Sequence, residues 1–393
     1  MYFPRKIENE LKTQITKKEI VVLTGMRRTG KTTLLKRIYD EVKSQNKIFL
    51  DLENPLEQKI FDETDYNNIL ENLKALGADV RKKIYLFIDE IQFMPQISSV
   101  VKYLFDHYNI KFFLSGSSSF YLKNLFPQSL SGRKVVYELY PLTFSEFLIF
   151  KGKNLRTPKN FSTKAKRKNE IECEKYSKLY REYLEFGGFP QVVLEEDVKQ
   201  KRAMLSDIFN SYFQIDILTL NDFKKIEAFK KLIFLLMERS GSKIDISKIA
   251  SLSGVSRDTI YSYLNLLQGS YFIHFIEPFS RNRDKEVSGT KKVYLCDTGI
   301  LNHLSKVSEG ALFENAVFNN LRQYGKINYY QKRTGSEIDF ILNEKIAFEV
   351  KITGDERDVA KMEKIAQKIK IKQSFLITKN FLNNDKAICA YQI

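Results

Sequence analysis

One stretch decides the fold of the N-terminal part of the chain: Val21-Val22-Leu23-Thr24-Gly25-Met26-Arg27-Arg28-Thr29-Gly30-Lys31-Thr32-Thr33. Its apolar start is typical of a buried strand, and residues 34–38 continue it with the pattern of a helix. Gly25 and Gly30-Lys31-Thr32 have the spacing of a P-loop, in which backbone N–H groups and a helix N-terminus surround a phosphate. The sequence therefore predicts a nucleoside triphosphate site.

The polar residues of this loop are expected to contact the phosphates and the metal ion of the nucleotide. The Lys31 ammonium is predicted to reach the β- and γ-phosphate oxygens, and the Thr32 hydroxyl to bind Mg²⁺. The other predicted nucleotide-binding residues are Gly25, Arg28, Thr29, Gly30 and Thr33. The expected cofactors are thus ATP and Mg²⁺.

A second apolar run, Ile84-Tyr85-Leu86-Phe87-Ile88, ends in the acidic pair Asp89-Glu90. Such a run is typical of a buried parallel strand. We interpret it as a Walker B strand, in which Asp89 holds the Mg²⁺ shell and Glu90 polarises the attacking water. The alternative is a core strand that ends in a solvated acidic turn.

A third strand is predicted within Lys111-Phe112-Phe113-Leu114-Ser115-Gly116-Ser117-Ser118-Ser119, which ends in small hydroxyl residues. We take Ser117 as a catalytic candidate, because a hydroxyl at this position would contact the γ-phosphate or the lytic water. The alternative is a serine-rich turn without a catalytic role.

The order of these parts resembles the AAA+ ATPase module: Walker A, Walker B, a polar sensor strand, and an arginine just before a fifth strand at residues 135–139. The resemblance places an arginine finger at Arg133, which would stabilise charge on ATP held by a neighbouring subunit. It thereby implies a homo-oligomer. The alternative is an ion pair between Arg133 and a local carboxylate.

Composition and charge limit the remaining choices. The 393 residues suffice for two or three domains, and 64 Lys and Arg against 48 Asp and Glu give a net charge of +16. This charge favours a polyanionic partner, with nucleic acid ahead of an acidic membrane, although Lys-rich surfaces also have other origins. The three cysteines show no zinc or pairing pattern, and no apolar stretch reaches about 18 residues. We therefore expect a cytoplasmic protein without a membrane segment.

A polar, strongly basic stretch at residues 151–170 interrupts the module. We interpret it as a solvated, mobile insertion; a contact with nucleic acid is the alternative. Beyond it, residues 176–184 have a helical pattern and run into the turn Gly187-Gly188-Phe189-Pro190. This part is expected to form a helical lid over the nucleotide.

Between Ile244 and Phe275 the pattern predicts a helix-turn-helix followed by a strand, as in winged-helix domains. Gly254 lies in the predicted turn, and Ser256 is placed to cap the second helix. We expect DNA, duplex or branched, to bind here, while docking of another protein is the alternative. The candidate DNA-binding residues are Arg257, Tyr261, Asn265, Arg281 and Arg283.

The C-terminal part carries a second group of polar residues. Period-two geometry puts Glu337 and Asp339 on one face of a predicted strand, and Glu349 and Lys351 on one face of the next. Such a cluster would hold Mg²⁺ or Mn²⁺ through Asp339 and Glu349, with Lys351 orienting or deprotonating water.

The order of Asp339, nine residues, and Glu349-Val350-Lys351 resembles the restriction-endonuclease-like fold of the PD-(D/E)XK family. The resemblance adds Glu314, on the preceding helix, to the candidate nuclease site. Ile338 replaces the family's proline, which leaves catalytic competence open. The alternative is a solvated face with an ordinary ion pair between Glu349 and Lys351.

Nearly the whole chain resembles a prokaryotic family of AAA+ ATPases with a winged helix and a nuclease-like C-terminal domain of unknown function. Two further stretches that match are Gly187–Pro190 and Lys292-Val293-Tyr294-Leu295-Cys296-Asp297-Thr298-Gly299. The resemblance implies an α/β chain in four parts. These are an ATPase core at 1–150, a basic insertion and lid at 151–240, a winged helix-turn-helix at 241–285, and the nuclease-like domain at 286–393.

The resulting functional hypothesis is an oligomeric AAA+ ATPase that couples ATP hydrolysis to a transaction on DNA. One alternative is a metal-dependent DNA nuclease that ATP regulates. The other is a nucleotide-switched protein-interaction module whose nuclease fold is inactive.

Overall fold

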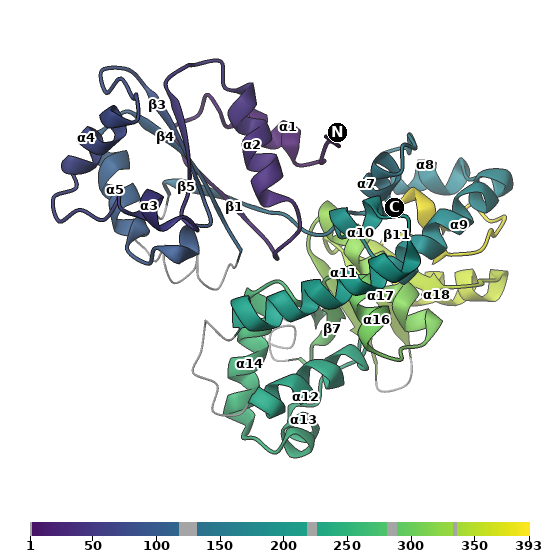
Figure 1. Ribbon diagram of the computed structural model, residues 1–393. Coiled ribbons are helices and arrows are strands. Elements are labelled where there is room, and N and C mark those ends of the chain that lie inside the picture. The colour runs from purple at the N-terminus through teal and green to yellow at the C-terminus, as the bar shows by residue number, and fades with distance from the viewer. Residues whose placement is uncertain (1, 118–131, 218–225, 281–288, 333–335) are drawn as a thin grey trace. The chain divides into compact units, whose positions relative to one another are not determined.

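The computed structural model describes residues 2–117, 132–217, 226–280, 289–332 and 336–393 (Figure 1). The chain divides into two compact units. The N-terminal unit comprises Met1–Tyr140 with the short pieces Gln214–Ile217 and Gly269–Tyr271, and the C-terminal unit comprises the remainder. The predicted α/β class is confirmed, with one sheet in each unit.

The sheet of the N-terminal unit is parallel throughout and has the strand order β2-β3-β4-β1-β5. Its strands are β1 (Ile20–Thr24), β2 (Lys47–Asp51), β3 (Ile84–Asp89), β4 (Ile110–Gly116) and β5 (Lys134–Glu138). The strand β4 lies between β1, which leads into the P-loop, and β3, which ends in the acidic pair. Parallel strands bring their carboxyl ends to one edge of the sheet, so the three predicted motifs meet there.

Helices cover both faces of this sheet (Figure 1). They are α1 (Glu8–Thr13), α2 (Lys31–Glu41), α3 (Pro55–Gln58), α4 (Asn68–Ala75) and α5 (Ile97–His107), with a 3₁₀ turn at Ile91–Phe93. Alternate residues of β1 face opposite sides: Val22 packs with α4 and α5, whereas Val21 packs with α1 and α2. A strand buried on both faces explains why its sequence is continuously apolar.

The C-terminal unit contains a seven-stranded mixed sheet with the order β12-β11-β10-β9-β8-β6-β7. The strands are β6 (Ile273–Pro278), β7 (Lys292–Leu295), β8 (Ile327–Gln331), β9 (Glu337–Leu342), β10 (Ile346–Lys351), β11 (Gln373–Thr378) and β12 (Ala387–Cys389). Strand β9 runs antiparallel to both of its neighbours, β8 and β10, and β11 pairs in parallel with β10. The predicted succession of helix, three strands, helix and strand is confirmed.

The described helices of this unit surround the sheet and form the helix-turn-helix. They are α7 (Phe144–Phe150), α8 (Phe161–Lys166), α9 (Glu170–Phe186), α10 (Pro190–Leu194), α11 (Val198–Ser211), α12 (Ile226–Met237), α13 (Ile246–Ser253), α14 (Arg257–Gly269), α16 (Thr298–Leu304), α17 (Glu309–Leu321), α18 (Glu356–Lys368) and 3₁₀ turns at Arg322–Tyr324 and Ala390–Gln392. A π-helical segment at Tyr212–Ile217 follows α11, and only its first two residues belong to this unit. One core cluster joins α18 to β9, β10 and β11. The helices of the predicted lid region therefore group with the C-terminal sheet rather than with the P-loop sheet.

The predicted helix-turn-helix and following strand are present as α13, α14 and β6. Gly254 ends α13 in the left-handed conformation, with φ +67°, and the Ser256 hydroxyl accepts a hydrogen bond from Thr259 N at 3.2 Å. A single bridge pairs Lys243 with Lys292 of β7, and β7 pairs with β6. Because β6 also pairs with β8, the strands that follow the helix-turn-helix are part of the C-terminal sheet. The four domain boundaries stay predictions.

The basic stretch at 151–170 differs from its interpretation as a solvated insertion. Helix α8 buries Phe161 and Ala165, and Phe161 packs edge-on against Phe348 of β10. The Lys164 ammonium is also buried, where it donates hydrogen bonds to Tyr324 Oη at 3.1 Å and to Gln392 O at 2.5 Å. Carbonyl and hydroxyl acceptors make burial of this charge tolerable, so part of the stretch is core.

Over the described ranges, the structure contains no helix with the length and apolar character needed to cross a bilayer.

Candidate functional site

The P-loop lies between β1 and α2 and has the backbone that a phosphate cradle needs. Gly30 adopts φ +95° directly before Lys31 begins α2. Gly25 lies so close to β5 that a Cβ atom there would be 2.1 Å from Leu139 O. Both positions therefore require glycine, for backbone conformation and for space respectively.

Lys31 is buried inside this loop. Its Nζ atom donates hydrogen bonds to Gly25 O and Met26 O, each at 3.1 Å. The Thr29 hydroxyl also donates to Met26 O, at 2.8 Å. These bonds shape the loop, and the ammonium is the group able to exchange carbonyl oxygens for phosphate oxygens.

Other predicted nucleotide contacts lie toward the surface of the loop. Thr32 is half-buried, while Arg28 and Thr33 are exposed. Arg28 has φ +63°, an unusual value for a residue with a side chain. The sequence did not identify Arg5, whose guanidinium donates to Thr29 O at 2.9 Å and to Tyr140 O at 2.7 Å. Arg5 thus anchors the loop from outside the motif.

Asp89 ends β3 beside Ser115 of the neighbouring strand β4. Its Oδ1 atom accepts hydrogen bonds from the Ser115 hydroxyl and from Glu90 N, the latter at 3.0 Å. Its Oδ2 atom is buried and has no hydrogen-bond partner among the described residues. A buried carboxylate oxygen with spare acceptor capacity fits a ligand of the Mg²⁺ shell.

Glu90 follows in a left-handed conformation, with φ +51° and ψ +46°. Burial raises the pKa of its carboxyl group, whereas Lys31 and the hydrogen bond from the Gln92 amide act to lower it. The Arg27 guanidinium also acts to lower this pKa. Lys31 and Glu90 therefore lie within electrostatic reach of one another, as a P-loop and a Walker B strand require.

Gln92 links Glu90 to the predicted sensor strand. Its Nε2 atom donates to Glu90 Oε2, and its Oε1 atom accepts a hydrogen bond from Ser117 N at 3.3 Å. Ser117 itself is buried. Sequence reasoning missed Gln92, although its position two residues after the acidic pair was a usable signal.

Arg133 has a local carboxylate partner. Its Nε atom lies 3.0 Å from Asp106 Oδ1, and both side chains are partly exposed. Such an ion pair with a local carboxylate was the alternative to an arginine finger. An exposed pair of this kind is weak enough to exchange partners, so the finger stays a prediction.

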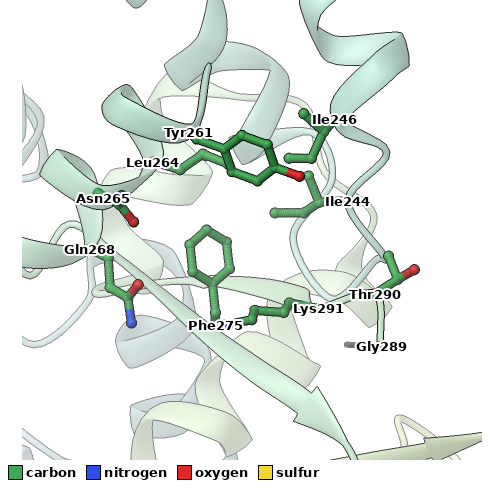
Figure 2. A pocket seen from close by; sticks show the side chains of 10 residues that line it. All are labelled: Ile244, Ile246, Tyr261, Leu264, Asn265, Gln268, Phe275, Gly289, Thr290 and Lys291. Carbon is green, nitrogen blue, oxygen red and sulfur yellow. The ribbon is translucent and has the colours of Figure 1, made fainter. Parts of the chain in front are cut away.

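The candidate DNA-binding surface is partly described. Arg257, Tyr261 and Asn265 are exposed along α14, as predicted. Tyr261 and Asn265 also line a pocket of about 370 Å³ beside β6 (Figure 2). Arg281 and Arg283 lie outside the described residues.

The predicted nuclease residues converge in the C-terminal unit, together with two residues that sequence reasoning missed. Lys292 of β7 is buried, and its Nζ lies 2.7 Å from Glu337 Oε1 and 3.7 Å from Glu314 Oε1. Tyr294 donates a hydrogen bond to Glu314 Oε1 at 2.6 Å. Both lie in the stretch 292–299 that matched the family.

The other half of this acidic cluster lies on β9 and β10. The backbone N–H of Val350 donates to Asp339 Oδ2 at 2.8 Å, and Lys351 Nζ lies 2.9 Å from Glu349 Oε1. Glu349 Oε2 is buried, and no described residue donates a hydrogen bond to it. The carboxylates on their separate strands thus share one region of the sheet.

Burial, together with the nearby Asp339 carboxylate, raises the pKa of Glu314 and of Glu349 to about 7. Burial likewise raises the pKa of Asp339, while Lys292 acts to lower it. Oxygen donors of this kind suit Mg²⁺ or Mn²⁺. However, within the described ranges no three His, Cys, Asp or Glu side chains are grouped closely enough to hold a metal ion. The ammonium groups of Lys292 and Lys351 form ion pairs with Glu337 and Glu349 and so neutralise part of the negative charge.

The two stretches that matched the family outside the motifs contact each other. Asp297 accepts hydrogen bonds from Gly188 N at 2.7 Å and from Ile300 N at 3.0 Å. A Cβ atom on Gly187 would lie 2.1 Å from Asp297 Oδ1, and one on Gly299 would lie 2.2 Å from Phe186 O. Their glycines are therefore explained by close packing between α9 and α16.

Family models match three parts of the chain. Residues 17–148 match an AAA domain, and residues 177–311 and 309–388 match two domains of unknown function. The solved structure of the Aeropyrum pernix ORC1 protein in complex with DNA aligns with 77% of this chain and 92% of that chain, at 13% identity. Its TM-score of 0.33 is too low to indicate a shared overall fold.

Relatives align over most of the chain. An uncharacterized protein of Haemophilus influenzae is 29% identical over 367 residues, which cover 87% of this chain and 86% of that protein. The uncharacterized protein MJ1544 of Methanocaldococcus jannaschii is 32% identical over 351 residues, which cover 86% of this chain and 75% of that protein. The chain, with its N-terminal AAA domain, therefore belongs to the family of MJ1544.

Proposed function

We propose that this protein is an ATPase that binds ATP with Mg²⁺ at the P-loop and couples hydrolysis to a transaction on DNA. The observation that carries the proposal is the meeting of Lys31, Asp89 and Glu90 at one edge of the parallel sheet. These are the three functions that phosphoryl transfer to water needs: a phosphate cation, a metal carboxylate and a water-activating base.

Each of these residues has a defined task in the proposal. Lys31 would hold the β- and γ-phosphate oxygens, and Thr32 and Asp89 would hold Mg²⁺. When bound, the metal supplies charge stabilisation at the transferred phosphoryl group. Glu90, which Lys31 and Gln92 help to keep ionised against the effect of burial, would accept the proton of the attacking water.

The proposal of DNA as partner rests on charge and on the exposed face of α14. The net charge of +16 favours a polyanion, and Arg257, Tyr261 and Asn265 are exposed on the second helix of a helix-turn-helix. A homo-oligomer follows only if Arg133 leaves Asp106 to act on ATP in a neighbouring subunit. Loss of turnover with unchanged ATP affinity in Arg133→Ala would support that arrangement, and loss of ATP binding would contradict it.

The experiment for the ATPase compares wild type with Lys31→Ala and Glu90→Gln. Lys31→Ala is expected to lose ATP binding, whereas Glu90→Gln should bind ATP and turn it over at least about 100-fold more slowly, as expected for loss of a general base. Turnover that survives both substitutions would contradict the assignment.

A metal-dependent nuclease is the second candidate, because Glu349 has a buried oxygen without a hydrogen-bond partner among the described residues, and the Asp339 carboxylate is near enough to raise its pKa. Under this candidate, Asp339→Ala and Lys351→Ala abolish cleavage of duplex, single-stranded or branched DNA with Mg²⁺ or Mn²⁺. Absence of cleavage by wild type on all these substrates would eliminate it.

A further inference from the structure

A pocket lies beside the helix-turn-helix, where α14 faces the strand β6 (Figure 2). Its volume of about 370 Å³ is within the range of ligand sites. Its lining residues are Ile244, Ile246, Tyr261, Leu264, Asn265, Gln268, Phe275, Gly289, Thr290 and Lys291. All of them belong to the C-terminal unit, so the pocket is a feature of that unit alone.

The walls combine flat apolar surface with amide groups. Tyr261, Asn265 and Gln268 lie at helical positions i, i+4 and i+7, so they share one face of α14. Figure 2 shows the rings of Tyr261 and Phe275 on the wall, and Ile244 and Ile246 opposite the Asn265 side. Tyr261 is 52% exposed, so a face of its ring is accessible to a ligand.

Two carboxamide side chains of the pocket can form hydrogen bonds with a ligand in defined directions. Asn265 and Gln268 are both exposed, and neither amide is bonded to a residue that the structure describes. A carboxamide offers one acceptor and two donors in a plane, the arrangement that matches the edge of a nucleobase. Unpaired bases commonly stack on an aromatic side chain, and a neighbouring amide can then hydrogen-bond to the edge of the base.

We propose that this pocket takes one unpaired nucleobase of a DNA strand. The base stacks on Tyr261, and its polar edge meets the amides of Asn265 and Gln268. Lys291, ion-paired with Glu277 at 3.1 Å, also lines the pocket. Lys243, Lys248 and Arg257 are exposed and lie within four residues of a lining residue in the sequence, so they favour a polyanionic strand. The inference rests on the proposed DNA binding and adds the feature of DNA that is recognised.

The experiment measures the affinity of the full-length protein for three DNAs of equal length. One is a perfect duplex, one carries a single bulged base, and one carries the same bulge as an abasic site. The abasic bulge keeps the bent backbone and removes only the base. We expect the bulged base to bind on the order of 10-fold more tightly than the abasic bulge, as one base stacked on an aromatic ring would contribute.

Variants separate the pocket from general DNA binding. Tyr261→Ala and Asn265→Ala should abolish the difference between the bulged base and the abasic bulge, and both side chains are exposed enough to be removed without unfolding. Arg257→Ala, outside the pocket, should weaken all three DNAs by the same factor and reduce the salt dependence. Ser262→Ala, on the same helix but not lining the pocket, is the control and should change nothing.

Three results would overturn the inference. If DNA binds in a salt-dependent way but the bulged base and the abasic bulge bind equally, DNA binding stands and the base pocket is wrong. If none of the three DNAs binds, the proposed partner fails along with the pocket. Binding of a free mononucleotide as tightly as the bulged DNA would likewise contradict a site for a base within a strand.

Discussion

Asp297 accepts a 2.7 Å hydrogen bond from the backbone of Gly188, 109 residues earlier in the chain. The same carboxylate occupies the space where a Cβ atom of Gly187 would lie. This contact joins the end of α9 to the start of α16. The stretch at residues 187–190 and the stretch at residues 292–299 are therefore packed against each other within the C-terminal unit.

Replacing Gly187 with alanine should destabilise the protein strongly. Gly187 has φ +75°, and the new methyl carbon would lie 2.1 Å from Asp297 Oδ1, so backbone strain and overpacking add up to on the order of 3 kcal/mol. The matched control is Gly152→Ala, at φ +66° with nothing within 4 Å, where only about 1 kcal/mol of strain is expected. Urea unfolding measures both. Equal losses of stability would show that the contact with Asp297 contributes nothing.

The same aspartate should give the protein a pH-dependent stability. Burial raises the pKa of Asp297 to about 6, against the hydrogen bonds from Gly188, Ile300 and Gly299. The folded state therefore binds the proton more tightly than the unfolded chain. The resulting stability is complete below pH 3.8 and is lost as the pH rises through about 6.

Asp297→Asn removes this titration. Between about pH 5 and about pH 7, wild type should lose roughly 1 kcal/mol more of its free energy of unfolding than the variant does. Unfolding curves at these two values measure the difference. A parallel loss in both proteins would contradict the assignment, whatever the absolute stability of the variant.

Gln92 should control the basicity of Glu90. Gln92→Ala removes a hydrogen bond that lowers the pKa of the Glu90 carboxyl group, so that pKa rises and the acid limb of the ATPase pH profile moves to higher pH. Because the link to Ser117 is also lost, kcat should fall about 10-fold with little change in KM, a loss typical of a positioning group. Gln96→Ala, an exposed glutamine four residues on, is the control. An unchanged pH profile in Gln92→Ala would show that Gln92 does not act on Glu90.

Lys292 should contribute to stability because its buried ammonium neutralises two half-buried carboxylates. Lys292→Met leaves Glu337 and Glu314 without their cation; removing one partner of a fully buried pair costs about 3–5 kcal/mol, so a loss below this range is expected. Glu337→Gln in the same protein should restore part of this loss, since the unpaired charge then disappears. Strictly additive effects in the double variant would contradict a direct pairing.

The sequence correctly predicted the features that depend on residues close to one another in the chain. The apolar runs before Gly25 and Asp89 form two strands of one parallel sheet, and Gly254 and Ser256 end and begin helices as expected. Period-two alternation also placed Asp339 and Glu349 in one acidic cluster. These features depend on residues close in sequence, or on a strand geometry that sequence patterns reveal.

The sequence did not predict features that depend on distant contacts. Lys292 reaches the acidic cluster only because β6 and β7 join the C-terminal sheet, a pairing that no local pattern indicates. Lys164 was counted as solvated charge, but Tyr324 and the C-terminal Gln392 bury its ammonium. Likewise, a motif places Glu90, but only the fold brings Gln92 and Ser117 together around it.

Steady-state ATP hydrolysis with and without duplex, bulged and branched DNA, at two salt concentrations and beside Lys31→Ala, decides whether ATP turnover is coupled to DNA. We expect Lys31-dependent turnover that DNA stimulates, with stimulation that fades as salt rises because phosphate contacts are screened. Lys31-dependent turnover that no DNA changes would contradict the coupling and favour a nucleotide-switched module that binds protein.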